Sequence, residues 1–104
     1  MNEKIFDLRE LFSKMDLDNS EFLNFFDLRH LKAGILKLKP GERDRQEPHS
    51  SDEIYLVLEG NGFIEIGKKA YIVKKDLFIY VPANAKHRFY GNTQEISVVY
   101  FFSD

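Results

Sequence analysis

The chain has 104 residues, a formal net charge of −2 and no cysteine. The lack of cysteine excludes a disulfide framework and thiolate chemistry, and the lack of a basic block argues against nucleic-acid binding. No apolar run approaches the length of a membrane span, and the N-terminus lacks the basic and apolar stretches of a signal peptide. We therefore expect a single domain, residues 1–104, that is soluble and cytoplasmic and binds neither nucleic acid nor membrane.

Residues 1–30 have the least regular pattern, and we expect them to form a short mixed segment that covers one face of the domain. Apolar residues recur there at three- and four-residue steps, as on one face of a helix. They are Ile5, Leu8, Leu11, Phe12 and Met15. A polar stretch follows at 16–20, and residues 22–26 are apolar again. Two arrangements fit this pattern: a short helix followed by a strand, or an edge strand at 4–7 followed by one helical turn.

Short apolar runs separated by turn signals fill residues 31–102. The expected strands are 31–38, 54–58, 63–66, 70–73, 77–81, 86–90 and 96–102. The Gly67-Lys68 pair suits a tight hairpin between two of them. Ten Phe and five Tyr in the chain also favour strands over helices. Seven to nine short strands at this spacing predict an all-β fold, a small antiparallel β-barrel or sandwich, and not alternating βαβ units.

Two of these strands, 54–58 and 96–102, carry apolar residues on both faces. A barrel of this size cannot bury both faces of its strands by itself. We therefore expect a homodimer that pairs two sheets, with residues 1–30 as the competing cover.

Metal-ligand residue types lie in two places. His49 and Glu53 are four residues apart, and His87 follows the Pro82 turn. Side chains on a strand alternate between faces, so Glu53 shares a face with Tyr55. Two histidines and a carboxylate suit a first-row metal with open coordination positions. Each residue alone also fits a surface ion pair or a solvated loop, and it is their combination with the glycine spacing that favours a metal.

A second carboxylate, Glu47, points the same way as His49 if Pro48 leaves the chain extended. It would make the ligand set harder and more anionic, which favours iron or manganese over copper. Considered by itself, Glu47 directly follows a charged loop over residues 42–46. A charged side chain in such a loop is usually exposed to solvent.

The spacing of these residues resembles the two motifs of the cupin superfamily. The first motif is matched by Gly41, Glu47, His49, Glu53 and Gly60, with Glu47 where the first histidine belongs. The second is matched in spacing by Asp76, Pro82, Asn84 and His87, with Gly91 in place of the final asparagine. Asp76 and Asn84 replace glycines, and both residue types tolerate turn conformations. The resemblance covers about residues 31–102.

This resemblance implies a jelly-roll barrel (a double-stranded β-helix) over 31–102 and one divalent transition metal per chain. The implied ligands are His49, Glu53 and His87, with Glu47 in the remaining position and Gln46 as the alternative if Pro48 kinks the approach. Iron or manganese is favoured, and zinc or nickel is possible.

Three functions follow from a small-molecule ligand in such a barrel. The first is a metal-dependent dioxygenase, with Glu47 or Glu53 as a candidate base and Tyr55 as a candidate proton carrier. The second is a metal-dependent isomerase or lyase acting on a sugar or an oxo-acid. The third is a non-catalytic module that binds or senses its ligand, which the replacement of the first motif histidine makes a serious contender.

Side chains around the barrel mouth complete the expected pocket. Phe78, Tyr80 and Phe89 are expected to form an inward aromatic wall, although core packing is their commoner role. Arg45 and Lys86 flank the mouth, where they would attract an anionic substrate or simply be exposed loop charges.

Overall fold

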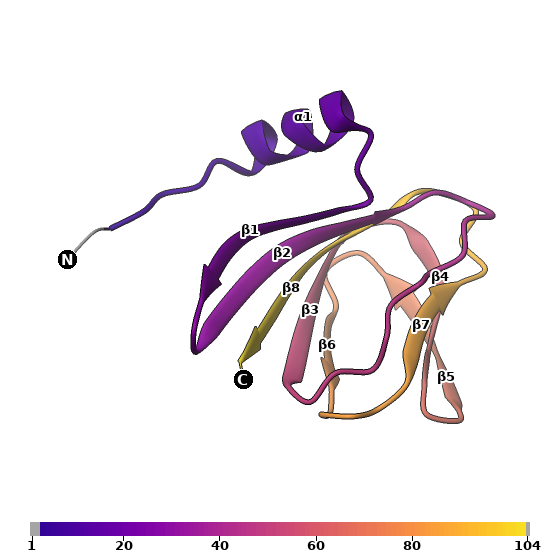
Figure 1. Ribbon diagram of the computed structural model, residues 1–104. Helices are drawn as coiled ribbons and strands as arrows, with labels where there is room; N and C mark the ends of the chain where they lie inside the picture. Colours follow the sequence, from indigo (N-terminus) through magenta and orange to yellow (C-terminus); the bar gives the residue numbers. More distant parts are fainter. Residues whose placement is uncertain (1–2, 104) are drawn as a thin grey trace.

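Eight antiparallel strands and one helix make up residues 3–103, the part of the chain that the computed structural model describes (Figure 1). In chain order they are α1 (Leu8–Asp18), β1 (Phe22–Leu28), β2 (Leu31–Leu38), β3 (Asp52–Glu59), β4 (Asn61–Ile66), β5 (Lys69–Lys74), β6 (Phe78–Val81), β7 (His87–Tyr90) and β8 (Ile96–Ser103). A five-stranded sheet has the order β1-β2-β8-β3-β6, and a three-stranded sheet has the order β5-β4-β7. The predicted all-β antiparallel fold is confirmed.

The core lies between the two sheets because strand side chains alternate. On β3, Tyr55 and Val57 are buried on the inner face with Glu53, whereas Ile54 points the other way and is exposed. The apolar core is completed by Leu36, Leu38, Ile64, Val73, Val81, Phe89, Ile96, Val98 and Tyr100. Fully burying one such side chain stabilises the fold by about 1.5–3 kcal/mol. Glu53 is therefore an acidic residue embedded among apolar neighbours.

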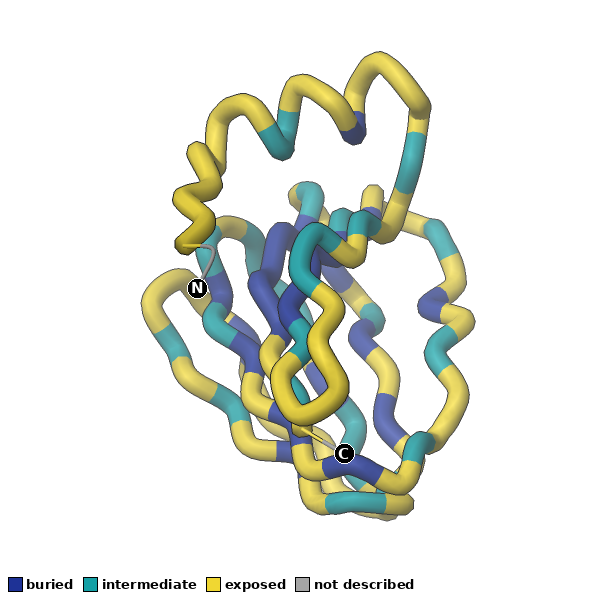
Figure 2. Tube along the Cα trace, turned by 60° about the vertical axis from the view of Figure 1, so that its left-hand side comes forward, coloured by how far each residue is buried: buried dark blue, intermediate teal, exposed yellow. Residues whose placement is uncertain are grey.

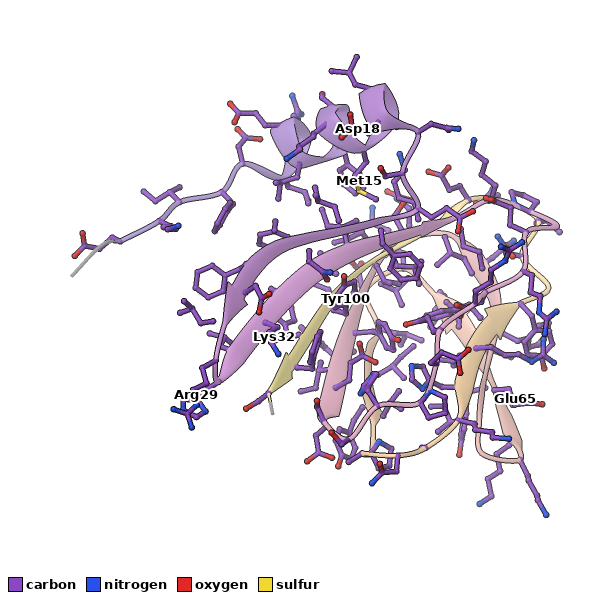
Figure 3. All side chains as sticks on the ribbon, viewed as in Figure 1. Met15, Asp18, Arg29, Lys32, Glu65 and Tyr100 are labelled. Carbon is purple, nitrogen blue, oxygen red and sulfur yellow. The ribbon has the colours of Figure 1, made fainter. Side chains whose placement is uncertain are left out.

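Helix α1 lies on the side of the five-stranded sheet that faces away from the three-stranded sheet (Figure 1). It begins after Asp7, whose carboxylate accepts hydrogen bonds from the backbone N–H groups of Arg9 and Glu10, and it ends at Asn19 in the left-handed conformation. Most of the helix is exposed (Figure 2). Met15, by contrast, points toward the sheet and packs against the outer face with Ile35 (Figure 3).

Of the two N-terminal arrangements, the structure has the helix followed by a strand, and residues 4–7 form no strand. Strand β1 pairs with β2 and contains an irregularity between Asn24 and Phe26. The predicted hairpin at Gly67 is confirmed: β4 and β5 pair across it, and Gly67 has a φ of 61°. No helix in residues 3–103 is long and apolar enough to cross a membrane.

The expected aromatic wall is wrong in two of its three members. Phe89 is buried in the core, but Phe78 and Tyr80 are exposed. The pairing register explains this, because Tyr80 lies opposite Ile54, and Phe78 lies opposite Leu56. Cross-strand partners share a face, so these aromatic rings lie on the outer face of the sheet.

Candidate metal site

Three side chains from separate parts of the chain converge on one point. His49 lies in the loop before β3, Glu53 is in β3, and His87 is the first residue of β7. Their ligand atoms all lie within 4.8 Å of one another. Glu53 Oε1 is 3.1 Å from His49 Nε2 and 3.3 Å from His87 Nε2. Glu53 is only 3% exposed and His87 is also buried, whereas His49 is half-buried and forms the outer side of the site.

Backbone hydrogen bonds hold the two histidine-bearing loops together. The Asn84 N–H group donates to the carbonyl oxygen of His49 at 2.7 Å. Asn84 has a φ of 67°, as the turn-tolerant residue types in the second motif predict. The Asp52 carboxylate accepts from the N–H of Ala83 and the hydroxyl of Tyr80, both at 2.9 Å. Both hydrogen bonds lower the pKa of Asp52, and the bond from the Ala83 N–H has the larger effect. The turn that leads into His87 is thus fixed to the strand that carries Glu53.

Each histidine is oriented by its second ring nitrogen. His49 Nδ1 is 3.1 Å from the Ser51 carbonyl oxygen, and His87 Nδ1 is 3.0 Å from the Ala85 carbonyl oxygen. A carbonyl can only accept, so both Nδ1 atoms carry the proton. In the neutral rings, both Nε2 atoms therefore present a lone pair to the Glu53 carboxylate. This is the tautomer that binds a metal through Nε2, with a backbone carbonyl fixing the other nitrogen.

The arrangement leaves an unsatisfied polar atom in the core. His87 Nε2 is buried without a hydrogen-bond partner, because its contact with Glu53 lacks hydrogen-bond geometry. Burial lowers the pKa of His87, but the neighbouring Glu53 carboxylate and the Ala85 carbonyl raise it, and the net pKa is raised. Two lone pairs and a carboxylate oxygen facing one another require a cation between them, either a proton or a metal ion. The donor set and its geometry fit a divalent metal.

Aromatic side chains surround the three residues. The His49 ring stacks on Phe102 with centroids 5.6 Å apart, and the Tyr55 ring lies 6.0 Å from that of His87. The Tyr55 hydroxyl donates to Gln46 Oε1 at 2.7 Å. Burial, followed by the charge of Glu53, raises the pKa of Tyr55 well above its usual range. The site thus contains a neutral phenol in an apolar setting that strengthens electrostatic interactions.

The structure does not bring Glu47 into this group. Its side chain is exposed, while that of Gln46, the alternative residue, is half-buried and bonded to Tyr55. The backbone N–H and side-chain amide of Gln46 both donate to Asp44, which turns Gln46 inward and leaves Glu47 outside.

Two further expectations concerned residues around the mouth, and a third concerned the charged loop over residues 42–46. Arg45 and Lys86 are both exposed. Asp44, which we expected in a solvated charged loop, is only 8% exposed. Its local sequence is charged on both sides, so nothing in the pattern distinguishes it from its solvated neighbours.

Comparison with known proteins agrees with this geometry. A family model described as "Cupin domain" matches residues 34–103. An uncharacterized protein of Streptomyces coelicolor, SCO3923, is 32% identical over 96% of this chain and 95% of its own length. The dimethylsulfoniopropionate lyase DddW of Ruegeria pomeroyi is 28% identical over 72% of this chain, which spans only 49% of the lyase.

A solved structure supports the fold. An RmlC-like cupin family protein of Methanocaldococcus jannaschii, described as a double-stranded β-helix, superposes with a TM-score of 0.77. The match covers 99% of this chain and 92% of that protein at 15% identity, and it therefore bears on the fold alone.

Proposed function

Since the chain belongs to the cupin family, we propose that it binds one divalent transition metal through His49, Glu53 and His87 and holds a small molecule at that metal. The observation that carries this proposal is the buried His87 Nε2, which has no hydrogen-bond partner and faces a carboxylate oxygen 3.3 Å away. Buried polar atoms of native proteins almost always have partners, and a metal ion supplies the missing one.

The donor set favours particular metals. Two imidazole nitrogens and one carboxylate with open positions form the set typical of non-haem iron. With Glu47 outside the group, the second carboxylate no longer adds to this preference. Iron or manganese stays our first expectation, with zinc or nickel as alternatives. When bound, such a metal supplies a Lewis acid that polarises a substrate oxygen at its open positions.

The chain's own residues supply the rest of the site. His49 and His87 are held in place through their Nδ1–H groups. The Tyr55 hydroxyl holds a proton at Oη inside the apolar shell, which suits a proton carrier near a bound ligand. Phe89 packs edge-on against Tyr55, and Phe102 stacks on the His49 ring. These features fit an enzyme of the dioxygenase type, and they also fit a non-catalytic ligand-binding module.

A lyase is the second candidate, and the match to DddW favours it. The test is to incubate the protein, loaded in turn with iron, manganese, zinc and nickel, with dimethylsulfoniopropionate and to follow the substrate by proton NMR. Loss of the substrate signal that requires both the metal and Glu53 supports the lyase. An unchanged signal with every metal excludes this substrate for the chain.

Metal binding itself is tested by calorimetric titration of chelator-treated protein with Mn²⁺, Co²⁺, Zn²⁺ and, without oxygen, Fe²⁺. We expect one metal per chain in the wild type and no stoichiometric binding in His87→Ala. The matched control is His30→Ala, because His30 is exposed and lies outside the site. A wild type that takes up none of these metals, or a His87→Ala variant that binds as the wild type does, contradicts the proposal.

A further inference from the structure

The inner face of the five-stranded sheet carries a lysine close to the proposed metal site. Lys32 of β2 (labelled in Figure 3) is half-buried and lies opposite Phe102 of β8, which in turn lies opposite Glu53 of β3. Cross-strand partners share a face, so these three side chains form one row across the sheet. Lys32 is therefore two strands away from a proposed metal ligand and on the same side of the sheet.

The Phe102 ring connects the lysine with the metal site. Lys32 Nζ lies 5.7 Å from the centre of this ring, within the range of a cation–π interaction. The His49 ring stacks on Phe102 with centroids 5.6 Å apart, and His49 is one of the three residues whose ligand atoms converge. Strands β2 and β3 are two strand spacings apart, about 10 Å. The ammonium and the metal position are thus within the length of one small organic molecule.

The charges on the two sides of Phe102 favour one class of ligand. A divalent metal held by one carboxylate and two neutral imidazoles leaves the site with a net positive charge. An ammonium has three N–H donors, so it can bind a carboxylate in addition to any contact that it makes within the chain. Because Lys32 is half-buried beside an aromatic ring, its attraction for an anion is screened less than it would be in bulk water.

From this juxtaposition we infer that Lys32 determines the class of ligand. The site takes a short-chain organic acid, which has an oxygen at one end for the metal and a carboxylate at the other end for the Lys32 ammonium. The inference rests on the proposed metal-binding function and names the ligand class for that site. Arg45 and Lys86, the two cations expected at the mouth, are exposed on loops, whereas the pairing register of β2 fixes the place of Lys32.

Lys32 also has an acidic neighbour, which offers a purely structural role. Asp27 of β1 is its cross-strand partner on the other side and is exposed. Opposite charges on facing strands attract, and an exposed pair of this kind contributes little to stability. If Lys32 served only this pair, Asp27→Asn would have the same effect as the loss of Lys32.

The test is the binding of matched probes to Zn²⁺-loaded protein, measured by calorimetry. The probes are glycolate, β-hydroxypropionate and γ-hydroxybutyrate, each compared with its neutral amide of the same length. We expect at least one acid to bind more tightly than its amide. In Lys32→Met we expect this acid to bind about tenfold to a hundredfold more weakly, the effect of losing one hydrogen bond between charged groups. Lys32→Arg keeps the charge and is expected to keep most of the affinity.

Two controls remove a charge elsewhere. Lys69→Met, at an exposed position on β5, changes the net charge equally and is expected to bind the acid as the wild type does. Asp27→Asn is expected to bind the acid at least as tightly as the wild type. Far-UV circular dichroism checks folding, and Lys32→Gln replaces Lys32→Met if that variant does not fold. The inference is overturned if no acid binds better than its amide, if Lys32→Met retains wild-type affinity, or if either control weakens binding as much.

A second readout separates this inference from the proposed function. The Lys32 side-chain Cε resonance, assigned by its loss in Lys32→Met, is followed by NMR while each acid is added to metal-free and to Zn²⁺-loaded protein. We expect a shift that saturates, with no such shift for Lys69 or with the amides. If the wild type binds no metal but Lys32 responds in this way, the carboxylate subsite stands and only the metal function fails. If Lys32 responds in neither form, the inference is overturned whether or not the metal binds.

Discussion

Gly34 of β2 lies directly against the Tyr100 side chain on the inner face of the five-stranded sheet. A Cβ atom on Gly34 would lie 2.2 Å from Tyr100 Oη and 2.3 Å from Cζ, which is closer than atoms can approach. The Tyr100 hydroxyl donates to Asn24 Oδ1, and burial, with a smaller effect of the Glu53 charge, raises the pKa of Tyr100 to about 12. Tyr100 (labelled in Figure 3) therefore cannot move aside without losing a hydrogen bond at the rim of the core.

We predict that Gly34→Ala lowers the free energy of unfolding by about 1–3 kcal/mol, the usual cost of overpacking a core. Urea denaturation of metal-free protein measures this, with the exposed-site variant Lys69→Ala as the reference for an unimportant strand substitution. A free energy of unfolding that equals the wild-type value would show that Tyr100 is not held where the structure has it.

At the same scale, sequence spacing predicted some site residues and missed others. Glu53 and His87 lie on strands, where the alternation of side chains constrains their direction, whereas His49 lies in a loop and is predicted by motif spacing alone; the structure brings the three ligand atoms together. Glu47 and Asp44 lie in an irregular loop, where no period relates position to direction. Their places are decided by long-range hydrogen bonds, above all the bond between Asp44 and the Phe89 N–H, 45 positions away. Local sequence carries no signal for such a bond.

At the scale of elements, turn residues predict the bounds of the strands in residues 31–102 close to those in the structure. Gly60 shows why such signals are strong: its φ is 112°, and a Cβ there would lie 2.7 Å from the Ile96 backbone. Two arrangements fit the N-terminal segment because its helix packs, through Leu11, Phe12 and Met15, on a sheet face that is distant in the sequence. The prediction that Phe78 and Tyr80 point inward is wrong because the pairing register of β6 with β3 decides which sheet face their side chains occupy. The sequence of a single strand does not show its pairing register.

At the scale of the whole molecule, the helix covers only part of the outer sheet face. The remaining outer patch consists of Ile54, Phe78, Tyr80 and Phe101, which are between 41% and 73% exposed. Strand pairing makes them neighbours, because Ile54 lies opposite both Tyr80 and Phe101. A contiguous exposed apolar patch of this kind commonly marks an interaction surface. It is the place where the homodimer expected from the sequence would form.

We predict a homodimer through this outer patch, with a mass by light scattering of twice the 12.3 kDa chain. Ile54→Lys puts a charge at the centre of the patch and is expected to give monomers. Leu17→Lys, at a position on α1 that is 87% exposed, is the matched control and is expected to stay dimeric. A monomeric wild type, or dimers that survive Ile54→Lys, would show that the patch is not the dimer interface.

The central claim is that His49, Glu53 and His87 form a metal site, and metal content tests it most directly. The measurement is elemental mass spectrometry on protein purified without a nickel column, for the wild type and for His49→Ala. The account predicts close to one metal per chain in the wild type, with iron or manganese first, and little or none in His49→Ala. A folded wild type that carries no metal and takes none up on reconstitution would contradict it.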